Sequence, residues 1–123
     1  MKEKKRTLIL GASPNPDRYA YKATVSLHQK GHPVFPVGLR QGLIHNIEIL
    51  TNNPVIEEID TVTLYVGPKN QPVYYDYIIH QIKPKRIIFN PGTENQELMD
   101  LAAANGIENE VACTLVLLSI NSY

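Results

Sequence analysis

The residues with the clearest chemistry follow a short β-rich run at residues 7–10. They form a turn of small residues and prolines that ends in a cation and an aromatic ring: Gly11, Ala12, Ser13, Pro14, Arg18 and Tyr19. Such a turn between a strand and a helix lets backbone N–H groups approach an anion, and the helix N-terminus adds partial positive charge. Ser13 can donate its hydroxyl, and the guanidinium of Arg18 matches phosphate oxygens. The turn therefore predicts a phosphate site, with a plain tight turn and an exposed arginine as the alternative.

This turn differs from the two best-known nucleotide loops. Ser13 and Pro16 replace the second and third glycines of a dinucleotide fingerprint, and no Gly-Lys-Ser/Thr of a Walker A loop follows. About 20 residues beyond the glycine loop, NAD sites carry an acid for the ribose hydroxyl. This sequence instead has Gly38 and Arg40 after its second expected strand. A cation there disfavours NAD and favours a nucleotide with an additional phosphate, either NADP or coenzyme A; a surface arginine without a ligand is the alternative.

Two further expected strands also end in residues that suit a ligand path. These residues are Tyr65, Val66 and Gly67 after one strand and Asn90, Pro91 and Gly92 after the next. Tyr65 and Val66 can form an apolar wall for an adenine ring, and Gly67 leaves room for an extended chain. Asn90 offers a donor and an acceptor beside a rigid turn. Each group is also typical of ordinary strand endings, so the prediction depends on four loops that meet at one edge.

Short apolar runs alternate with helix-period segments, which indicates an α/β fold. The expected strands are residues 7–10, 33–37, 61–66 and 86–89, with a last short strand around Val111. The expected helices are residues 20–30, 74–82 and 98–105. Right-handed crossovers between such strands give a parallel sheet of about five strands with helices on both faces. Ligands bind such sheets at the carboxyl ends of the strands, where the strand order reverses.

Other segments are less regular. Thr93 and Gln96 have the spacing of a capping box, which predicts that a helix starts there. Residues 47–50 are expected to form a short edge strand, and residues 115–120 fit a strand or a helix. We expect one three-layer domain over residues 7–123, preceded by a basic, solvated tail at residues 1–6.

Composition limits the classes of function. The 123 residues carry 12 basic and 12 acidic side chains, a balance that argues against a protein that wraps nucleic acid. No apolar stretch reaches the about 20 residues that cross a bilayer, and no apolar signal core follows the basic start. Cys113 is the single cysteine, so no internal disulfide can form, which is typical of a reducing cytoplasm. We therefore expect a cytoplasmic protein that binds a small molecule and neither nucleic acid nor membrane; no protein partner is indicated.

No residues are arranged for catalysis. Cys113 could react near a thiol cofactor, but its apolar neighbours supply no activating cation, and a buried structural cysteine is the simpler interpretation. The four histidines lack metal-ligand spacing. Glu94, Glu97 and Asp100 lie near the start of an expected helix, where negative charge favours the helix dipole. We expect neither a metal site nor a reaction of the domain's own.

Over nearly its whole length, the sequence resembles the CoA-binding domain proteins. These are small stand-alone Rossmann-like domains that are similar to the N-terminal CoA-binding domain of the succinyl-CoA synthetase α subunit. The resemblance is carried by residues 11–16 with Arg18 and Tyr19, residues 36–40, and residues 90–92 with Glu94 and Asn95. It implies that the loop at residues 11–13 and Arg40 lie near the phosphates of coenzyme A. It also implies that residues 65–67 and 90–92 line the path of the nucleotide and the pantetheine.

The resemblance has two limits. A common pattern in the family is Asn-Pro after the second strand, where this chain has Val37 and Gly38. In the synthetase, a separate domain carries the phosphorylated histidine and the transfer chemistry, so the resemblance implies a binding site and no ligase reaction. The leading hypothesis is non-catalytic binding of coenzyme A or an acyl-CoA at the carboxyl edge of the sheet. The alternatives are an NADP-binding small reductase or fragment, and a protein interaction module that has lost its nucleotide ligand.

Overall fold

The computed structural model describes residues 3–123, and five of its strands form one parallel sheet. In spatial order these strands are β2 (Val34–Val37), β1 (Thr7–Leu10), β5 (Thr61–Leu64), β6 (Arg86–Phe89) and β7 (Glu108–Val111). Two short strands, β3 (Leu43–Ile44) and β4 (Ile47–Glu48), form a separate antiparallel hairpin. The expected parallel sheet of about five strands is therefore confirmed.

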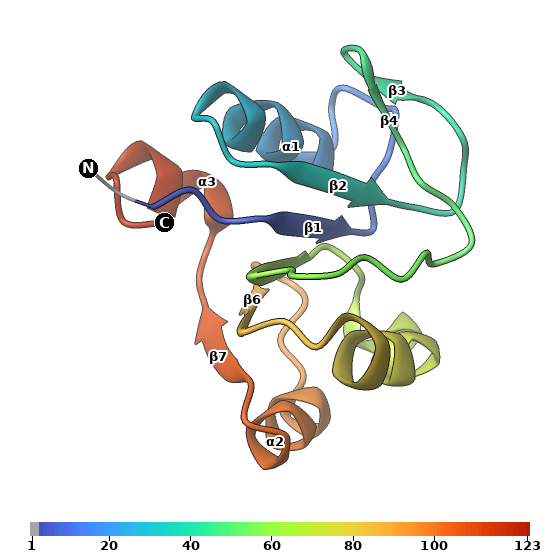
Figure 1. Ribbon diagram of the computed structural model, residues 1–123, viewed down its shortest axis with the longest axis vertical. Helices are drawn as coiled ribbons and strands as arrows, with labels where there is room; N and C mark the ends of the chain where they lie inside the picture. Colours follow the sequence, from blue (N-terminus) through green and yellow to red (C-terminus); the bar gives the residue numbers. More distant parts are fainter. Residues whose placement is uncertain (1–2) are drawn as a thin grey trace.

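Helices cover both faces of the sheet, as Figure 1 shows. One face carries α1 (Tyr19–Gln29) and α3 (Thr114–Ser119), which pack on a core that includes Ile9 and Ile88. The other face carries η3 (Tyr77–Ile82) and α2 (Gln96–Ala104), which pack on a core that includes Leu8 and Ile87. Two single turns of 3-10 helix, η1 (Pro68–Asn70) and η2 (Pro72–Tyr74), precede η3. The molecule is thus a Rossmann-like domain of three layers.

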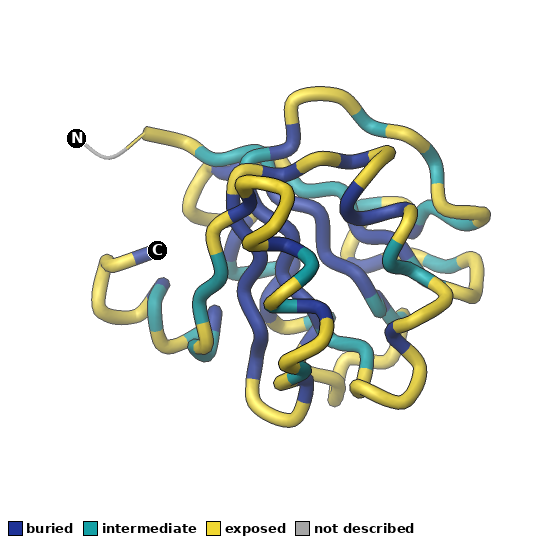
Figure 2. The backbone as a smooth tube through the Cα atoms, turned by 90° about the horizontal axis from the view of Figure 1, so that it is seen from below, coloured by how far each residue is buried: buried dark blue, intermediate teal, exposed yellow. Residues whose placement is uncertain are grey.

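The three central strands are buried along their whole length (Figure 2). Parallel strands that are covered on both faces read as nearly continuous apolar runs, which is why the sequence showed them clearly. Successive residues serve opposite cores: Leu8 and Leu10 belong to one cluster, and Ile9 belongs to the other. This rigid centre positions the loops that follow each strand.

The segment between β5 and β6 differs from the expected helix at residues 74–82. It consists of the turns η1 and η2 followed by η3, a π-helix. The N–H group of Lys83 donates to the Ile78 carbonyl at 3.0 Å, a bond five residues long, and Lys83 itself is left-handed with φ 52°. Because a residue before proline is pushed away from the helical region, Pro84 accounts for this ending.

Helix α2 starts at a different cap from the one predicted. The side-chain oxygen of Asn95 accepts the N–H groups of Glu97 and Leu98. The Thr93 hydroxyl donates instead to the Asn90 carbonyl at 2.7 Å. The capping box of Thr93 and Gln96 is therefore wrong, because a nearer asparagine satisfies the helix start.

The structure also shows the conformation of the segments whose sequence pattern was less regular. Strand β2 lies at the sheet edge, where Pro36 is tolerated because a missing donor there breaks no ladder bond. Leu50 runs beside this edge: its N–H donates to the Pro36 carbonyl at 2.8 Å, and its carbonyl accepts from Gly38 at 2.9 Å. Residues 47–50 thus combine β4 with a bridge to β2. Residues 114–119 form the helix α3.

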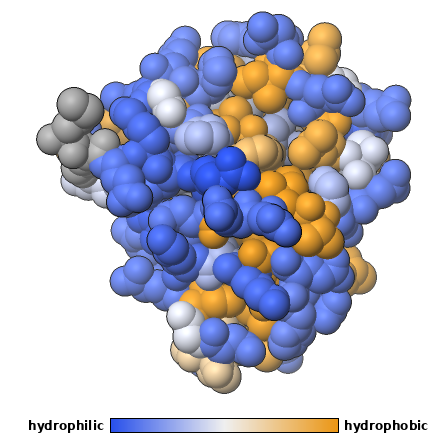
Figure 3. Space-filling view, viewed as in Figure 1, coloured by the Kyte–Doolittle hydropathy of each residue, from blue (hydrophilic) through white to orange (hydrophobic). Residues whose placement is uncertain are grey.

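The basic segment before β1 is tied to the domain over part of its length. The N–H group of Lys5 donates to His32 Nδ1 at 2.9 Å, and the Arg6 guanidinium donates to the carbonyls of Glu57 and Glu58. The expected tail also includes residues 1–2, which lie outside the described residues. The face of the molecule drawn in Figure 3 is mainly hydrophilic, with apolar residues gathered across its middle. Among residues 3–123, no helix is long and apolar enough to cross a membrane.

Candidate functional site

A cavity of about 1050 Å³ opens at the carboxyl ends of the strands. Of the residues predicted to bind a ligand, all except Asn90 line it: Gly11, Ala12, Ser13, Pro14, Arg18, Tyr19, Gly38, Arg40, Tyr65, Val66, Gly67, Pro91 and Gly92. They come from the loops after β1, β2, β5 and β6. The cavity lies beside β1, whose neighbours are β2 and β5, so the strand order reverses here. Parallel α/β sheets bind ligands at this position.

Two glycines let the loops approach one another. Gly11 has φ 96°, and a Cβ there would lie 3.0 Å from the Tyr65 carbonyl carbon. A Cβ on Gly38 would overlap the Ala12 carbonyl oxygen. The N–H groups of Gly11 and Ala12 both donate to the Val37 carbonyl, at 3.0 and 2.9 Å. These two amides therefore hold the loops together, and they do not form the anion cradle that the sequence suggested.

The N-terminus of α1 faces the cavity without a side-chain cap. Arg18 occupies the cap position in an extended conformation, and the first turn holds no acidic residue. Tyr19 and Ala20, the first two residues of the helix, line the cavity. The unpaired N–H groups of a helix start and its dipole favour an anion. The Ser13 hydroxyl lies at the same end and accepts the N–H group of Asn15 at 3.1 Å.

Three cations line the cavity: Arg18, Arg40 and Lys69. All three are exposed, and within residues 3–123 none of their side chains forms a hydrogen bond or an ion pair. No carboxylate belongs to the described lining. Positive charge is thus left unneutralised beside the uncapped helix start, and the cavity suits a ligand with several negative charges.

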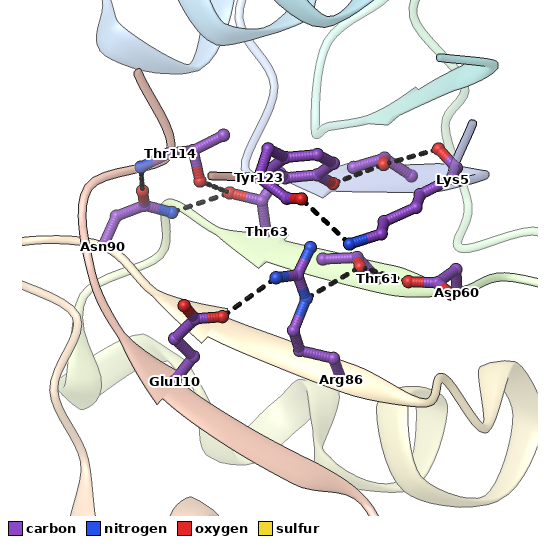
Figure 4. A network of polar contacts seen from close by, with 10 residues as sticks. Lys5, Asp60, Thr61, Thr63, Arg86, Asn90, Glu110, Thr114 and Tyr123 are labelled. Atoms are coloured by element: carbon purple, nitrogen blue, oxygen red, sulfur yellow. Dashed lines mark hydrogen bonds and ion pairs between the residues drawn. The ribbon is translucent and has the colours of Figure 1, made fainter. Parts of the chain in front are cut away.

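Asn90 lies outside the cavity, contrary to the position expected for it. Its side chain is buried and donates to the Thr63 hydroxyl at 2.7 Å and the Leu64 carbonyl at 2.9 Å. Its oxygen accepts the Thr114 N–H at 2.9 Å (Figure 4). These bonds occupy the polar atoms of the amide, so its role is to join β5, β6 and α3. The neighbouring Pro91 and Gly92 do reach the cavity.

Tyr65 and Val66 form the half-buried wall at the end of β5. Burial raises the pKa of Tyr65 to about 12, although contacts with the hydroxyls of Thr114 and Thr63 act in the opposite direction. The ring is therefore neutral at ordinary pH and offers an apolar surface. A Cβ on Gly67 would have no heavy atom within 4 Å, so the passage beside this wall is open.

Some lining residues were missing from the sequence prediction. They are Asn15, Ala20, Leu39, Lys69, Asn70, Pro72, Val73, Tyr74 and Thr93. Asn15 and Leu39 fall inside motifs that the sequence analysis singled out. Lys69 and Val73 lie on η1 and η2, between the strand expected at residues 61–66 and the helix expected at residues 74–82. The signal that could have found them is the proline-rich stretch itself, because two prolines start two short turns.

The described lining contains no histidine, cysteine or carboxylate. Cys113 lies outside it, at the cap position of α3, and is half-buried where a buried structural cysteine was expected. No group of three metal-binding side chains occurs among residues 3–123. The cavity thus combines three cations without a protein partner in the described chain with an apolar wall.

Comparison with known proteins identifies the family. Residues 5–119 match a family described as CoA binding domain. The chain belongs to this family. The match agrees with the resemblance seen in the sequence, and it covers all the loops that line the cavity. No curated protein matches this CoA binding domain significantly.

Solved structures share the fold of this chain. The crystal structure of an uncharacterized protein is 50% identical and has a TM-score of 0.95, over 99% of this chain and 100% of that one. A hypothetical protein from Pyrococcus horikoshii OT3 is 27% identical with a TM-score of 0.80, over 92% and 80% of the two chains. A protein from Thermus thermophilus is 20% identical with a TM-score of 0.81, over 97% and 91%, and this likeness shows the fold.

Proposed function

We propose that this domain binds coenzyme A or an acyl-CoA in the cavity and catalyses no reaction of its own. The observation that carries the proposal is the set of three cations, Arg18, Arg40 and Lys69, which line the cavity without a protein partner in the described chain. Coenzyme A carries a diphosphate and a ribose phosphate, and both groups need positive charge or donors. Family membership supports the same ligand. A cytoplasmic location and a likeness to succinyl-CoA synthetase stay predictions.

The cavity also fits the remainder of such a ligand. Its volume of about 1050 Å³ is just above the roughly 300–1,000 Å³ typical of small-molecule sites, which leaves room for an extended nucleotide. Tyr65 and Val66 supply an apolar wall for adenine or pantetheine. The space beside Gly67 is open, which leaves a passage along that wall. Arg40 follows β2, where an NAD site would carry an acid, and it is assigned to the additional ribose phosphate.

Calorimetry tests the role of Arg40 by removing each partner in turn. Coenzyme A should bind about tenfold or more tightly than dephospho-CoA, because a charge-assisted hydrogen bond contributes about 1.5–3 kcal/mol. Arg40→Ala should lower the affinity for coenzyme A to that of dephospho-CoA and leave the affinity for dephospho-CoA nearly unchanged. Lys85→Ala is the control, since Lys85 is exposed and precedes β6 at the opposite edge of the sheet.

Three outcomes would count against the proposal. Equal wild-type affinities for coenzyme A and dephospho-CoA would contradict the role of Arg40. Tighter binding of NADP than of coenzyme A would favour the reductase alternative, especially if nicotinamide absorbance then changed with candidate substrates. Absence of nucleotide binding would favour the interaction module.

A further inference from the structure

Gln71 joins two loops that line the cavity. It is fully buried, and its Nε2 donates to the Val66 carbonyl at 2.9 Å and to the Thr93 carbonyl at 2.7 Å. Val66 follows β5 and Thr93 follows β6, and both residues line the cavity. A primary amide nitrogen carries two hydrogens, so both donors are used. One side chain thus fixes the separation of two cavity walls.

The other end of this amide is held by Asn95. The Nδ2 group of Asn95 donates to Gln71 Oε1 at 2.8 Å and to the Tyr75 hydroxyl at 2.8 Å. The opposite atom, Asn95 Oδ1, accepts the Glu97 N–H at 3.1 Å at the start of α2. Asn95 therefore sets the direction of the Gln71 amide, with its oxygen toward α2 and its nitrogen toward the two carbonyls.

The segment that contains Gln71 supplies many of the cavity-lining residues that were not predicted from the sequence. Lys69 lies on η1 and Val73 lies on η2, and both residues line the cavity. Gln71 is the residue that connects these two turns. Single 3-10 turns have poor hydrogen-bond geometry and little stability of their own. None of the residues in η1 or η2 is buried. Gln71 is therefore the buried anchor of this wall.

We propose that Gln71 is a positioning residue for the ligand. It does not line the cavity; it acts through Val66, Thr93 and the turns on either side, which it holds where the nucleotide carrier must pass. Loss of its two donor bonds leaves two carbonyls unpaired and frees both walls to move. The inference rests on the proposed binding of coenzyme A.

Two substitutions separate this role from general stability. Gln71→Met has similar length and no donor, and Gln71→Glu has the same shape with a carboxylate. At pH 8, both should raise the Kd for coenzyme A about tenfold relative to wild type at the same pH. Burial raises the pKa of such a carboxyl group, and its protonated form regains one donor. From pH 8 to pH 5.5, the Kd ratio to wild type should therefore fall for Gln71→Glu and stay constant for Gln71→Met.

Controls keep the test independent of folding. Gln81→Met removes an exposed amide that donates to Asp76, and it should bind as wild type. If the Gln71 variants unfold, Asn95→Asp tests the same cavity wall. This variant keeps the oxygen that caps α2 and loses the donor to Gln71, and its Kd for coenzyme A should rise a few-fold. Circular dichroism at the assay temperature checks the folded state.

The results distinguish the two proposals. If wild type binds coenzyme A and the folded Gln71→Met and Asn95→Asp variants bind with unchanged affinity, the positioning role is overturned and the proposed function stands. If wild type does not bind coenzyme A, the proposed function itself fails, and this inference fails with it.

Discussion

Gly38 shows how a residue without a side chain shapes the cavity. Its backbone lies so close to the loop after β1 that a Cβ would overlap the Ala12 carbonyl oxygen. The sequence marked Gly38 as the end of a strand, but its partner lies 26 positions earlier in the chain. Periodicity and turn composition report local structure, and they carry no information on such a contact.

A single methyl group at this position should disturb the site. In Gly38→Ala, the new Cβ must displace the loop that carries Ser13, so we expect the affinity for coenzyme A to fall about tenfold. Overpacking of this kind costs about 1–3 kcal/mol in the free energy of unfolding. Urea unfolding and calorimetry measure the two effects. Gly67→Ala is the control for stability, because open space surrounds its Cβ; a Gly38→Ala variant as stable as wild type would contradict the argument.

Some side chains around the cavity have positions that follow from the local sequence, and others have positions that depend on distant contacts. Arg40 and Tyr65 could be predicted, because the carboxyl end of a parallel strand fixes where the next residues lie. For Lys69 the prolines that start η1 and η2 indicate only local turns, because the path of its loop to the cavity depends on the bonds of Gln71 to residues up to 24 positions away. Asn90 also follows a strand, yet its side chain turns inward to buried partners that the sequence does not reveal.

At the scale of elements, the strands were predictable and the helix ends were not. Continuous apolar runs identify β1, β5 and β6 because both of their faces are covered. The π-helix η3 was expected as an α-helix, since its apolar residues step by four in either case. The start of α2 depended on whether Thr93 or Asn95 reached the free N–H groups, and the Thr93 hydroxyl is engaged in a local turn, where it donates to the Asn90 carbonyl.

Asn90 joins three elements, and its removal should affect stability more than binding. Asn90→Ala loses three buried hydrogen bonds that connect β5, β6 and α3. Because partners such as the Thr114 N–H are then unsatisfied, the free energy of unfolding should fall by about 2 kcal/mol. Chemical denaturation measures this change, with Asn105→Ala as a control that removes an exposed bond to the Leu101 carbonyl. A large loss of affinity in the folded variant, at wild-type stability, would instead place Asn90 at the ligand.

At the scale of the whole molecule, the two ends of the described chain meet beside the sheet. His32 accepts the Lys5 N–H, and its ring packs edge-on against Tyr123 at 4.9 Å between centroids. The Lys5 ammonium donates to the Tyr123 main-chain oxygen at 2.9 Å, and the Arg86 guanidinium lies 4.7 Å from the centre of the Tyr123 ring (Figure 4). These residues are up to 118 positions apart, so no local pattern could predict their contact.

Because of this cluster, we expect the stability of the fold to depend on pH. Burial, followed by the charges of Lys4, Lys5 and Arg86, lowers the pKa of His32, and Asp60 opposes them weakly. A lowered pKa in the folded state favours the neutral ring. The resulting stability is present above the unfolded pKa of about 6.5 and is lost as the pH falls through the folded value.

Urea unfolding between pH 7.5 and pH 5.5 should therefore show stability that decreases toward acid. His32→Gln keeps a hydrogen-bond acceptor and removes the titrating ring, so its profile should be flatter over this range. His80→Gln, at an exposed position, should retain the wild-type slope. A His32→Gln profile as steep as that of wild type would show that other groups cause the acid loss.

The reversal of strand order at β1 has a consequence for how a ligand and the fold depend on each other. The three cations belong to connections that are separated by whole β-α units, so the cavity exists only when both halves of the sheet have docked. A bound molecule that contacts all three connections stabilises the docking of the two halves, and this stabilisation is lost when the molecule dissociates. By mass action, a ligand at one hundred times its Kd would add about 2.7 kcal/mol to the stability of the native state, so the midpoint of thermal unfolding would rise with the concentration of that ligand.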